Sequence, residues 1–265
     1  MKLQKHPLNT DFEWPDVTGP FRLITQEQAD AYNRQGFFVL ESAFNPADIE
    51  HLTQIIDGYE QKTEAFLREQ KDGKMFISRA DDITFSAHIA MRESWIGEFA
   101  TNQVFQDLMH DLIGAKAMLY WDQAVYKKPD TTLLFPWHQD NGYTYIEPQT
   151  YVTCWLALTD ANENNGCPWL MPGQHREGTL NHKIHELGLV CAEDPVDNAV
   201  CVPVKAGDIA VFSSLTPHKT GPNLTEQTRK TYILQYSHQQ ITRAEKQGDS
   251  YVRHDATNLP NQIVF

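Results

Sequence analysis

The spacing of apolar residues divides the chain into two parts. Up to about Gly114, apolar positions recur mostly every three or four residues, which is the period of a helix with one buried face. From Ala115 to about Gln240, they form short runs separated by Gly, Pro and Asn, which is typical of β-strands joined by turns. The pattern therefore predicts helices first and a β-structure second.

Three helices are predicted in the first part from their start signals. Thr25 is followed three positions later by Gln28, which is a capping-box pattern. Asn45 before Pro46, and Asn102, are favoured N-caps. The predicted helices cover 26–36, 46–68 and 103–113, the last closed by Gly114. Around them we expect an extended arm over 1–22, strands at 37–40 and 75–78, and an ambiguous, partly helical stretch over 80–98.

The second part predicts a β-rich fold. Short strands after a helical part favour a jelly roll or barrel flanked by helices. No change of composition marks a linker, so we predict one domain over 1–265, with a mostly helical part at 1–114 and a jelly-roll core at 115–240. The predicted strands are 116–125, 133–137, 151–158, 168–171, 199–203, 208–212 and 230–236.

Charge and composition limit the classes of partner. A net charge of -13 argues against nucleic acid or an anionic membrane surface, since both require a basic surface. No run approaches the roughly 18 apolar residues of a membrane span. Residues 1–10 lack the apolar region of a secretory signal, so we expect a cytoplasmic protein. We expect reduced thiols rather than a zinc site, because no C-x-x-C pair occurs among Cys154, Cys167, Cys191 and Cys201.

The first candidate for chemistry is a His-x-Asp pair, His138 and Asp140, in the extended run 135–140. Side chains alternate along a strand, so positions i and i+2 point to the same side. His138 and Asp140 therefore aim at one spot, while Gln139 points elsewhere. They are two members of a 2-His-1-carboxylate triad, which binds non-haem Fe(II) and leaves coordination positions open. Such a pair also occurs by chance, so the downstream residues decide its meaning.

Two downstream residues complete a chemical set. His218 follows Asp140 by 78 positions, far enough for a barrel to bring it back beside the pair, and Arg229 follows directly before a predicted strand. Each alone would be an ordinary surface or core residue. Together they suggest three metal ligands and a guanidinium that binds a dicarboxylate through two hydrogen bonds. Thr220 shares a face with His218 and is a candidate for the same carboxylate.

These residues resemble the phytanoyl-CoA dioxygenase family of Fe(II)- and 2-oxoglutarate-dependent oxygenases. The resemblance covers most of the chain from about Thr25 and is densest from Tyr120 to Tyr236. His138, Asp140, His218 and Arg229 stand at the family's spacing. Further matches are Gln123, Lys128-Pro129, the strand Thr153-Cys154-Trp155-Leu156-Ala157-Leu158, Asn165-Gly166-Cys167 and Met171-Pro172-Gly173-Gln174-His175, in which Gln174 replaces the usual Ser.

The resemblance implies a double-stranded β-helix with Fe(II) bound by His138, Asp140 and His218. It also implies that 2-oxoglutarate chelates the iron, with Arg229 and Thr220 binding its far carboxylate and Gln123 and Trp155 lining its pocket. O2 would then drive decarboxylation to succinate and oxidation of a substrate C–H bond, with ascorbate as reductant. Because halogenating relatives lack the carboxylate, Asp140 favours hydroxylation. The substrate is expected to be a small organic molecule.

Other residues are weaker candidates. Asn141, Tyr143 and Tyr145 follow the ligand pair and are candidates for a substrate-facing rim, with a solvated loop as the alternative. Arg79 and Arg92 are candidates for an acidic substrate, with surface ion pairs as the alternative. Three histidines, His175, His182 and His185, are interpreted as surface residues rather than a second metal site.

Two other functions compete with the dioxygenase. One is a non-catalytic jelly-roll protein that binds a metal or ligand. The other is a cupin-like metalloenzyme that uses another metal and no 2-oxoglutarate. The metal ligands together with Arg229 favour the dioxygenase, because a protein without this chemistry has no physical need for both. The acidic sequence leaves monomer and dimer open.

Overall fold

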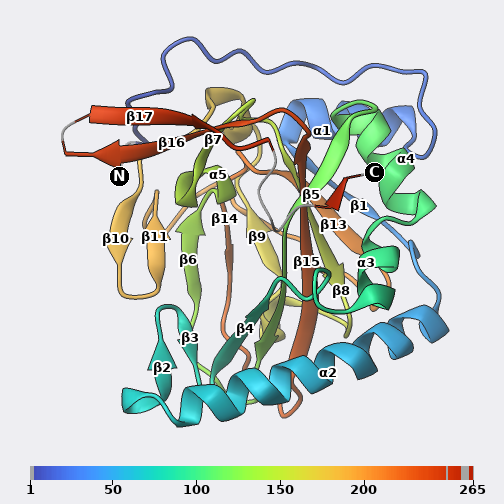
Figure 1. The fold of residues 1–265 in the computed structure, drawn as a ribbon, viewed down its shortest axis with the longest axis vertical. Helices are drawn as coiled ribbons and strands as arrows, with labels where there is room; N and C mark the ends of the chain where they lie inside the picture. The colour runs from blue at the N-terminus through green and yellow to red at the C-terminus, as the bar shows by residue number, and fades with distance from the viewer. Residues whose placement is uncertain (1–2, 249, 258–262, 265) are drawn as a thin grey trace.

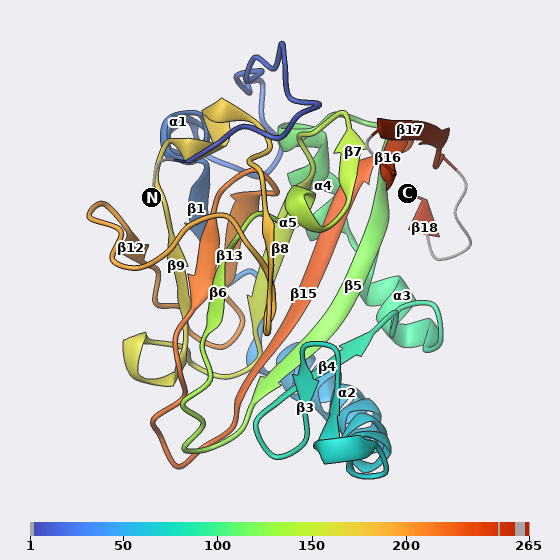
Figure 2. The ribbon, with the colours of Figure 1, turned by 90° about the vertical axis from the view of Figure 1, so that its left-hand side faces the viewer.

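Two β-sheets face each other in the computed structural model, which describes residues 3–248, 250–257 and 263–264 (Figure 2). The neighbouring strands are antiparallel. The large sheet has the order β1 (Phe37–Leu40), β13 (Ile209–Ser213), β8 (Val152–Ala157), β15 (Arg229–His238), β5 (Ala117–Lys127), β4 (Ile83–Ala87), β3 (Ser78–Arg79) and β2 (Lys74–Met75), with β18 (Ile263–Val264) added to β5. The smaller sheet has the order β12 (Val200–Cys201), β9 (Pro168–Leu170), β14 (His218–Thr220) and β6 (Phe135–His138).

Two small sheets extend this sandwich at one side. One contains β17 (Ser250–Asp255), β16 (Thr242–Gln247) and β7 (Tyr145–Glu147), and the other is the hairpin of β10 (Lys183–His185) and β11 (Gly188–Val190). Both lie on the side of the molecule where β6 forms the edge of the smaller sheet (Figure 1). The β-rich fold with flanking helices, predicted from the sequence, is confirmed.

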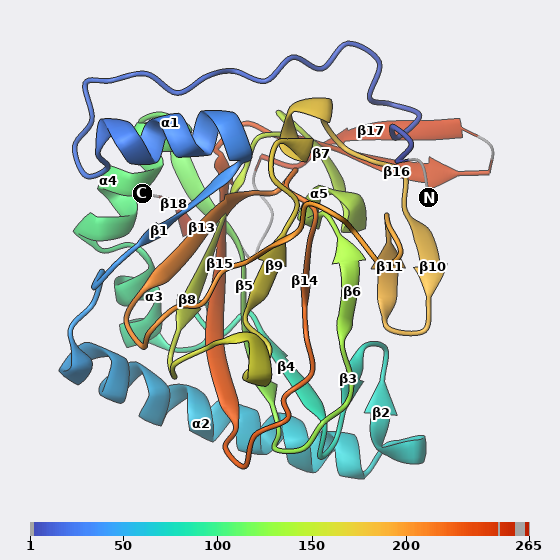
Figure 3. The same ribbon diagram turned by 180° about the vertical axis from the view of Figure 1, so that it is seen from behind.

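The helices pack mainly outside the large sheet, with α1 and α2 at opposite ends of the molecule (Figure 3). The α-helices are α1 (Gln26–Gln35), α2 (Pro46–Arg68), α3 (Ser94–Ala100), α4 (Gln103–Leu112) and α5 (Asp140–Tyr143), and the 3-10 helices are η1 (Lys71–Gly73), η2 (Glu163–Asn165) and η3 (Gln174–Glu177). The predicted caps are present: Thr25 and Gln28 form a capping box, and the side chains of Asn45 and Asn102 accept backbone N–H bonds.

Alternation along β15 explains how one strand serves two environments. Tyr232, Leu234 and Tyr236 point outward and pack in a core that includes Leu52 and Ile56 of α2. Residues of the opposite parity, among them Arg229 and Gln235, line the space between the sheets. The outer face therefore stabilises the fold by apolar burial, and the inner face is free to carry polar groups.

One predicted strand was wrong, and some strands were not predicted. The predicted strand at 75–78 is a hairpin of β2 and β3, because Phe76 at its turn has φ 51°. The stretch over 80–98 is partly helical, as expected, because it contains the start of α3, and it also contains the strand β4. The strands β16 and β17 lie beyond residue 240 in a separate three-stranded sheet with β7 and were not predicted.

Candidate metal centre

His138 and His218 are cross-strand neighbours. His138 ends β6, His218 begins β14, and the two residues face each other in the antiparallel register. Gln139 continues in an extended conformation and Asp140 then begins α5, so Asp140 lies just past the strand end rather than on it. The extended Gln139 still returns Asp140 to the side of His138. The side chain of Gln139 points away and donates to the carbonyls of Gly178 and Leu215.

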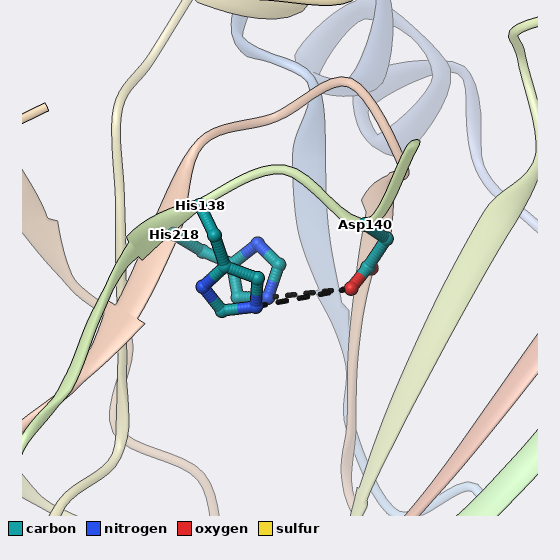
Figure 4. A group of neighbouring side chains, drawn as sticks. All are labelled: His138, Asp140 and His218. Carbon is teal, nitrogen blue, oxygen red and sulfur yellow. Dashed lines mark ion pairs between the residues drawn. The ribbon is translucent and has the colours of Figure 1, made fainter. Parts of the chain in front are cut away.

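The three side chains converge on one point (Figure 4). One carboxylate oxygen, Asp140 Oδ1, lies 3.9 Å from His138 Nε2 and 3.8 Å from His218 Nε2. One ligand atom from each residue lies within 4.8 Å of the other two. The imidazole ring centroids are 4.1 Å apart. Two nitrogens and one oxygen at this spacing form the donor set of a 2-His-1-carboxylate centre.

The hydrogen bonds of the two histidines direct the same nitrogen toward this point. His138 Nδ1 bonds to the Pro136 carbonyl at 2.8 Å, and His218 Nδ1 bonds to the Thr216 carbonyl at 3.1 Å. A carbonyl only accepts, so each Nδ1 carries the proton and each Nε2 offers a lone pair. Burial lowers the pKa of His138 to about 3 and that of His218 to about 4, so both are neutral at pH 7. A metal would therefore displace no proton from either ring.

Asp140 is held by a hydroxyl on the neighbouring sheet. Its Oδ2 accepts a hydrogen bond from Thr153 Oγ1 at 2.5 Å, and Gln235 Nε2 lies 3.5 Å from the same hydroxyl. This leaves Oδ1 directed at the histidines. Burial raises the pKa of Asp140, and the charges and hydrogen bonds around it act in the opposite direction. A cation at the centre would stabilise the ionised carboxylate.

The centre opens onto a cavity of about 780 Å³ between the sheets. All three donor residues line the cavity, so a ligand in the cavity can reach the point at which the donors meet. The donor set thus fits a divalent metal that keeps positions for other ligands. Among the described residues, the triad is the one group of three or more His, Cys, Asp or Glu residues with this spacing.

Arg229 lines the same cavity and is fully buried. Its Nη1 lies 3.4 Å from the Val125 carbonyl, its Nε has no hydrogen-bond partner, and its guanidinium lies 5.2 Å from the Trp155 ring centroid. No ion pair to Arg229 is found among the described residues. Burial lowers the pKa of Arg229 to about 9, so it remains charged at pH 7. A buried cation without an anion fits a carboxylate ligand.

Lys127 strengthens this positive region. It is paired with Arg229 across β5 and β15, and it is fully buried. Its ammonium donates to the carbonyls of Leu133, Thr220 and Gly221. Burial, and then the charge of Arg229, lower the pKa of Lys127. An anion entering beside Arg229 would favour the charged form of Lys127.

The remaining predicted pocket residues lie on the cavity wall. Thr220 follows His218 on β14, Gln123 lies on β5, and Trp155 lies on β8. Trp155 pairs with Ile233, which in turn pairs with Gln123, so these three occupy one level of the large sheet. The structure therefore brings together every residue predicted for the metal and cosubstrate.

Some weaker candidates lie elsewhere. Tyr143 lines the cavity, but Asn141 is buried against Thr179 and Ile146, and the Tyr145 hydroxyl bonds to the Leu8 carbonyl. Arg79 lies 3.7 Å from Glu186, and Arg92 bonds to the carbonyls of Ala87 and His88.

The histidines outside the triad differ in exposure. His185 is exposed, as expected. The surface prediction was wrong for His175, which is fully buried because its ring packs on Trp14 and its Nε2 contacts the Asn33 carbonyl. It was also wrong for His182, which is partly buried and whose Nε2 accepts from the Gln139 backbone N–H.

Several lining residues were not among the sequence candidates. Thr153 is two positions before Trp155, so strand alternation alone would have placed it on the same face. Gln235 is likewise six positions after Arg229. Tyr120 and Trp121 both face the cavity although they are consecutive, because a β-bulge opposite Gln235 interrupts the alternation. Arg243 lies beyond the predicted core and had no sequence signal.

Comparison with known proteins identifies relatives along most of the chain. The family model described as Phytanoyl-CoA dioxygenase (PhyH) matches residues 32–231. A methylphosphonate hydroxylase from Gimesia maris is 28% identical over 222 residues, which cover 81% of each chain.

Solved structures share the fold. The carbocyclase SnoK from nogalamycin biosynthesis, described as α-ketoglutarate dependent, superposes with a TM-score of 0.72 at 18% identity, over 93% of this chain and 99% of that one. The epimerase SnoN, solved with Fe3+, α-ketoglutarate and nogalamycin RO, gives a TM-score of 0.68 at 17% identity, over 90% of this chain and 97% of that one. Both support the double-stranded β-helix predicted from the sequence.

Proposed function

This chain belongs to the phytanoyl-CoA dioxygenase family of Fe(II)- and 2-oxoglutarate-dependent oxygenases, and we propose that it hydroxylates a small organic molecule. The overall reaction joins R–H, 2-oxoglutarate and O2 to give R–OH, succinate and CO2. One oxygen atom enters the product and the other enters succinate, so the oxidation of the substrate and of the keto acid balances the reduction of O2. Ascorbate is the reductant expected to keep the iron ferrous.

The observation that carries this proposal is the buried, unpaired Arg229 in the same cavity as the triad. A metal-binding jelly roll without an anionic cosubstrate would have to keep this charge away from water without compensation. A dicarboxylate supplies the missing partner. This favours the 2-oxoglutarate enzyme over a cupin-like metalloenzyme without cosubstrate and over a non-catalytic binding protein.

Each group of the chain has a role in this reaction. His138, Asp140 and His218 would hold Fe(II), with both imidazoles already neutral and the carboxylate fixed by Thr153. Bound Fe(II) supplies O2 activation and the oxidation of the C–H bond. Arg229 and Thr220 would bind the distal carboxylate of 2-oxoglutarate, so its keto-acid end is directed to the metal. The apolar walls exclude water from the reacting atoms.

The test is to follow iron and cosubstrate binding separately from turnover. Wild-type protein with Fe(II) and 2-oxoglutarate should develop a metal-to-ligand charge-transfer band without O2 and release succinate with O2. His218→Ala should keep the fold, measured by circular dichroism, but lose the band and the succinate. Wild-type iron affinity in His218→Ala would remove His218 from the centre. A wild-type protein that binds iron but neither binds nor decarboxylates 2-oxoglutarate would instead support a metal-binding protein.

A further inference from the structure

The cavity is larger than its expected cosubstrate. A water molecule accounts for about 30 Å³ of liquid, so 2-oxoglutarate, with about ten non-hydrogen atoms, fills at most about 300 Å³. The cavity of about 780 Å³ therefore keeps roughly 500 Å³ for a substrate. By the same measure this is room for at least about 15 further non-hydrogen atoms. The substrate space is that of a medium-sized organic molecule.

The strand register orders the cavity from one end to the other. Arg229 lies level with Lys127 and Ile83 at one end of the large sheet. Gln235 lies level with Trp121 and Thr153, six residues further along β15. At about 3.3 Å per residue the two backbone positions are roughly 20 Å apart along the strand. The Arg229 guanidinium lies closer to the second level, because it is 5.2 Å from the ring centroid of Trp155, which pairs with Ile233, two positions before Gln235. Since Thr153 binds Asp140, the metal centre is at the second level, and Tyr120 lies beyond it.

The charge of the cavity wall is opposite to that of the molecule. The chain has 35 acidic and 22 basic Asp, Glu, Lys and Arg residues. Among the described residues that line the cavity, the one carboxylate is Asp140, which is assigned to the metal, whereas Arg229 and Arg243 both contribute guanidinium groups. An acidic protein that directs two cations into one cavity favours anions there. Arg229 is accounted for by 2-oxoglutarate, and Arg243 has no role in that cosubstrate.

Arg243 is placed near the metal side of the cavity by β16. Its side chain is 42% exposed, and its charge lowers the pKa of Tyr120 against the larger effect of burial, so it lies near the Tyr120 phenol. Arg243 Nε is 3.2 Å from Glu245 Oε1, but the buried N–H has no hydrogen-bond acceptor among the described residues. Glu245 is exposed to solvent, so it compensates the charge of Arg243 only in part. The rest of the guanidinium is available to a ligand.

The walls on either side of the metal centre are aromatic and apolar. The bulge on β5 turns both Tyr120 and Trp121 inward, and Tyr151 lies beside Tyr120, with ring centroids 5.7 Å apart. Further along the same sheet, the β2–β3 hairpin and β4 add an apolar wall that includes Ile77 and Phe85. No acidic group other than Asp140 is available among the described lining residues to bind a cationic substrate.

We propose that the substrate is an organic anion with an extended apolar or aromatic body, whose carboxylate, phosphonate or phosphate is bound by Arg243. Its body lies between the Tyr120–Trp121 bulge and the apolar wall, past the metal centre. This inference rests on the proposed function and specifies its substrate class. The proposed substrate differs from methylphosphonate, the substrate in the name of the Gimesia maris relative, because so small an anion would leave most of the substrate space unfilled.

The experiment compares matched probes on enzyme loaded with Fe(II) and 2-oxoglutarate. The probes are 6-phenylhexanoate, 6-phenylhexylphosphonate, the neutral 6-phenylhexanamide and the small anion methylphosphonate. Binding is read without O2 from the shift of the charge-transfer band, and turnover is read as succinate released above the substrate-free rate. The variants are Arg243→Gln and the control Arg253→Gln, a surface arginine on the neighbouring strand that pairs with Glu147 and does not line the cavity.

Wild type and Arg253→Gln should bind the two large anions at least about tenfold more tightly than the amide and more tightly than methylphosphonate. Arg243→Gln should reduce the preference over the amide to about threefold or less while its 2-oxoglutarate affinity stays unchanged. Equal binding of anion and amide, tightest binding of methylphosphonate, or no response to either large anion would overturn the proposal. Loss of the charge-transfer band in wild type would instead count against the proposed function.

Discussion

At the scale of single residues, Arg229 separates the proposed enzyme from a generic metal-binding jelly roll. Removing one partner of a buried charged pair costs about 2–5 kcal/mol, because the other charge is left unpaired. Arg229→Ala should therefore raise the Kd for 2-oxoglutarate by about 30-fold to several thousand-fold. Arg229→Lys should recover only part of the loss, since an ammonium lacks the planar fork.

The measurement is an anaerobic titration of 2-oxoglutarate into Fe(II)-loaded protein, followed by the charge-transfer band. Fe(II) affinity is the internal control and should stay near wild type, because Arg229 does not belong to the metal-binding triad. Equal 2-oxoglutarate affinities in wild type and Arg229→Ala would show that the carboxylate binds elsewhere.

Thr153 is the second residue with a specific expectation. Its hydroxyl donates a hydrogen bond to Asp140 Oδ2, which leaves Oδ1 for the metal. Without it, the carboxylate is free to turn or to bind through both oxygens, which would use a position needed by 2-oxoglutarate. Thr153→Val should weaken Fe(II) binding about tenfold or more, as loss of an outer hydrogen bond to a metal ligand commonly does. Thr153→Ser should restore most of it.

An anaerobic Fe(II) titration of the two variants checks this expectation. Valine has nearly the same shape as threonine, so Thr153→Val should change the packing little. A packing defect would lower the thermal stability of the variant, whereas loss of the hydrogen bond should lower its iron affinity. Wild-type iron affinity in Thr153→Val would mean that Asp140 is oriented by its backbone alone.

The residues of the centre differed in how far the sequence specified them. His138, Asp140, His218 and Arg229 were predictable because their chemistry requires particular residue types at characteristic spacings. The cavity-facing side of Thr153 follows from strand alternation, but its hydrogen bond to Asp140 does not, because that bond forms only where the two sheets pack face to face. Arg243 lies on a strand that the apolar pattern did not predict.

At the scale of elements, Asp122 connects the large sheet to the segment after β4. Its buried carboxylate accepts hydrogen bonds from the backbone N–H groups of Ile89 and Ala90 and from the Tyr232 hydroxyl. Asp122→Ala leaves these three donors unsatisfied, at about 1–3 kcal/mol for each buried group, so it should destabilise the fold by at least about 3 kcal/mol. Tyr232→Phe removes a single donor and should cost about 1 kcal/mol.

Urea unfolding of the two variants measures this difference. The comparison is informative because Tyr232→Phe retains the ring in the core and both backbone bonds. A similar loss in the two variants would show that the phenol, and not the backbone attachment of the segment, accounts for the contribution of Asp122.

Elements with local signals were predicted well, and elements created by pairing were not. The helices α1, α2 and α4 begin at capping residues that act within a few positions. Strand β4 follows a turn in which Asp81 has φ 65°, and its residues extend because β5 offers a partner edge. This partner strand lies some 40 positions away in the sequence, so the local spacing of apolar residues does not reveal it.

At the scale of the whole molecule, a large part of the chemistry is arranged by closing two sheets over one cavity. The large sheet contributes Arg229, Gln123 and Trp155, and the smaller sheet contributes the two histidines. The helices α1 to α4 pack in the core outside the cavity, which leaves the inner face of the large sheet to the ligands. In the described residues no helix is long and apolar enough to cross a bilayer.

Stability of the metal-free protein should depend on pH, because the fold buries several histidines in the neutral form. Burial lowers the pKa of His138 to about 3 and that of His175, His182 and His218 to about 4. In the unfolded chain histidine titrates near 6.5. Between these values the unfolded state binds more protons, so stability falls as the pH drops from about 6.5 toward 4. Each histidine contributes at most about 1.4 kcal/mol per pH unit, so the four together contribute at most about 5.6 kcal/mol per pH unit within this range.

Two buried carboxyls act in the opposite direction. Burial raises the pKa of Asp122 and Asp140, so the folded state takes up their protons at a higher pH than the unfolded chain, which offsets part of the loss. Four histidines against two carboxyls still leave a net fall. The urea midpoint of protein kept in EDTA should therefore decrease from pH 7 to pH 5. His175→Gln, remote from the metal centre, should reduce this dependence, and a midpoint that stays constant over the same range would show that the buried histidines are protonated in the folded state.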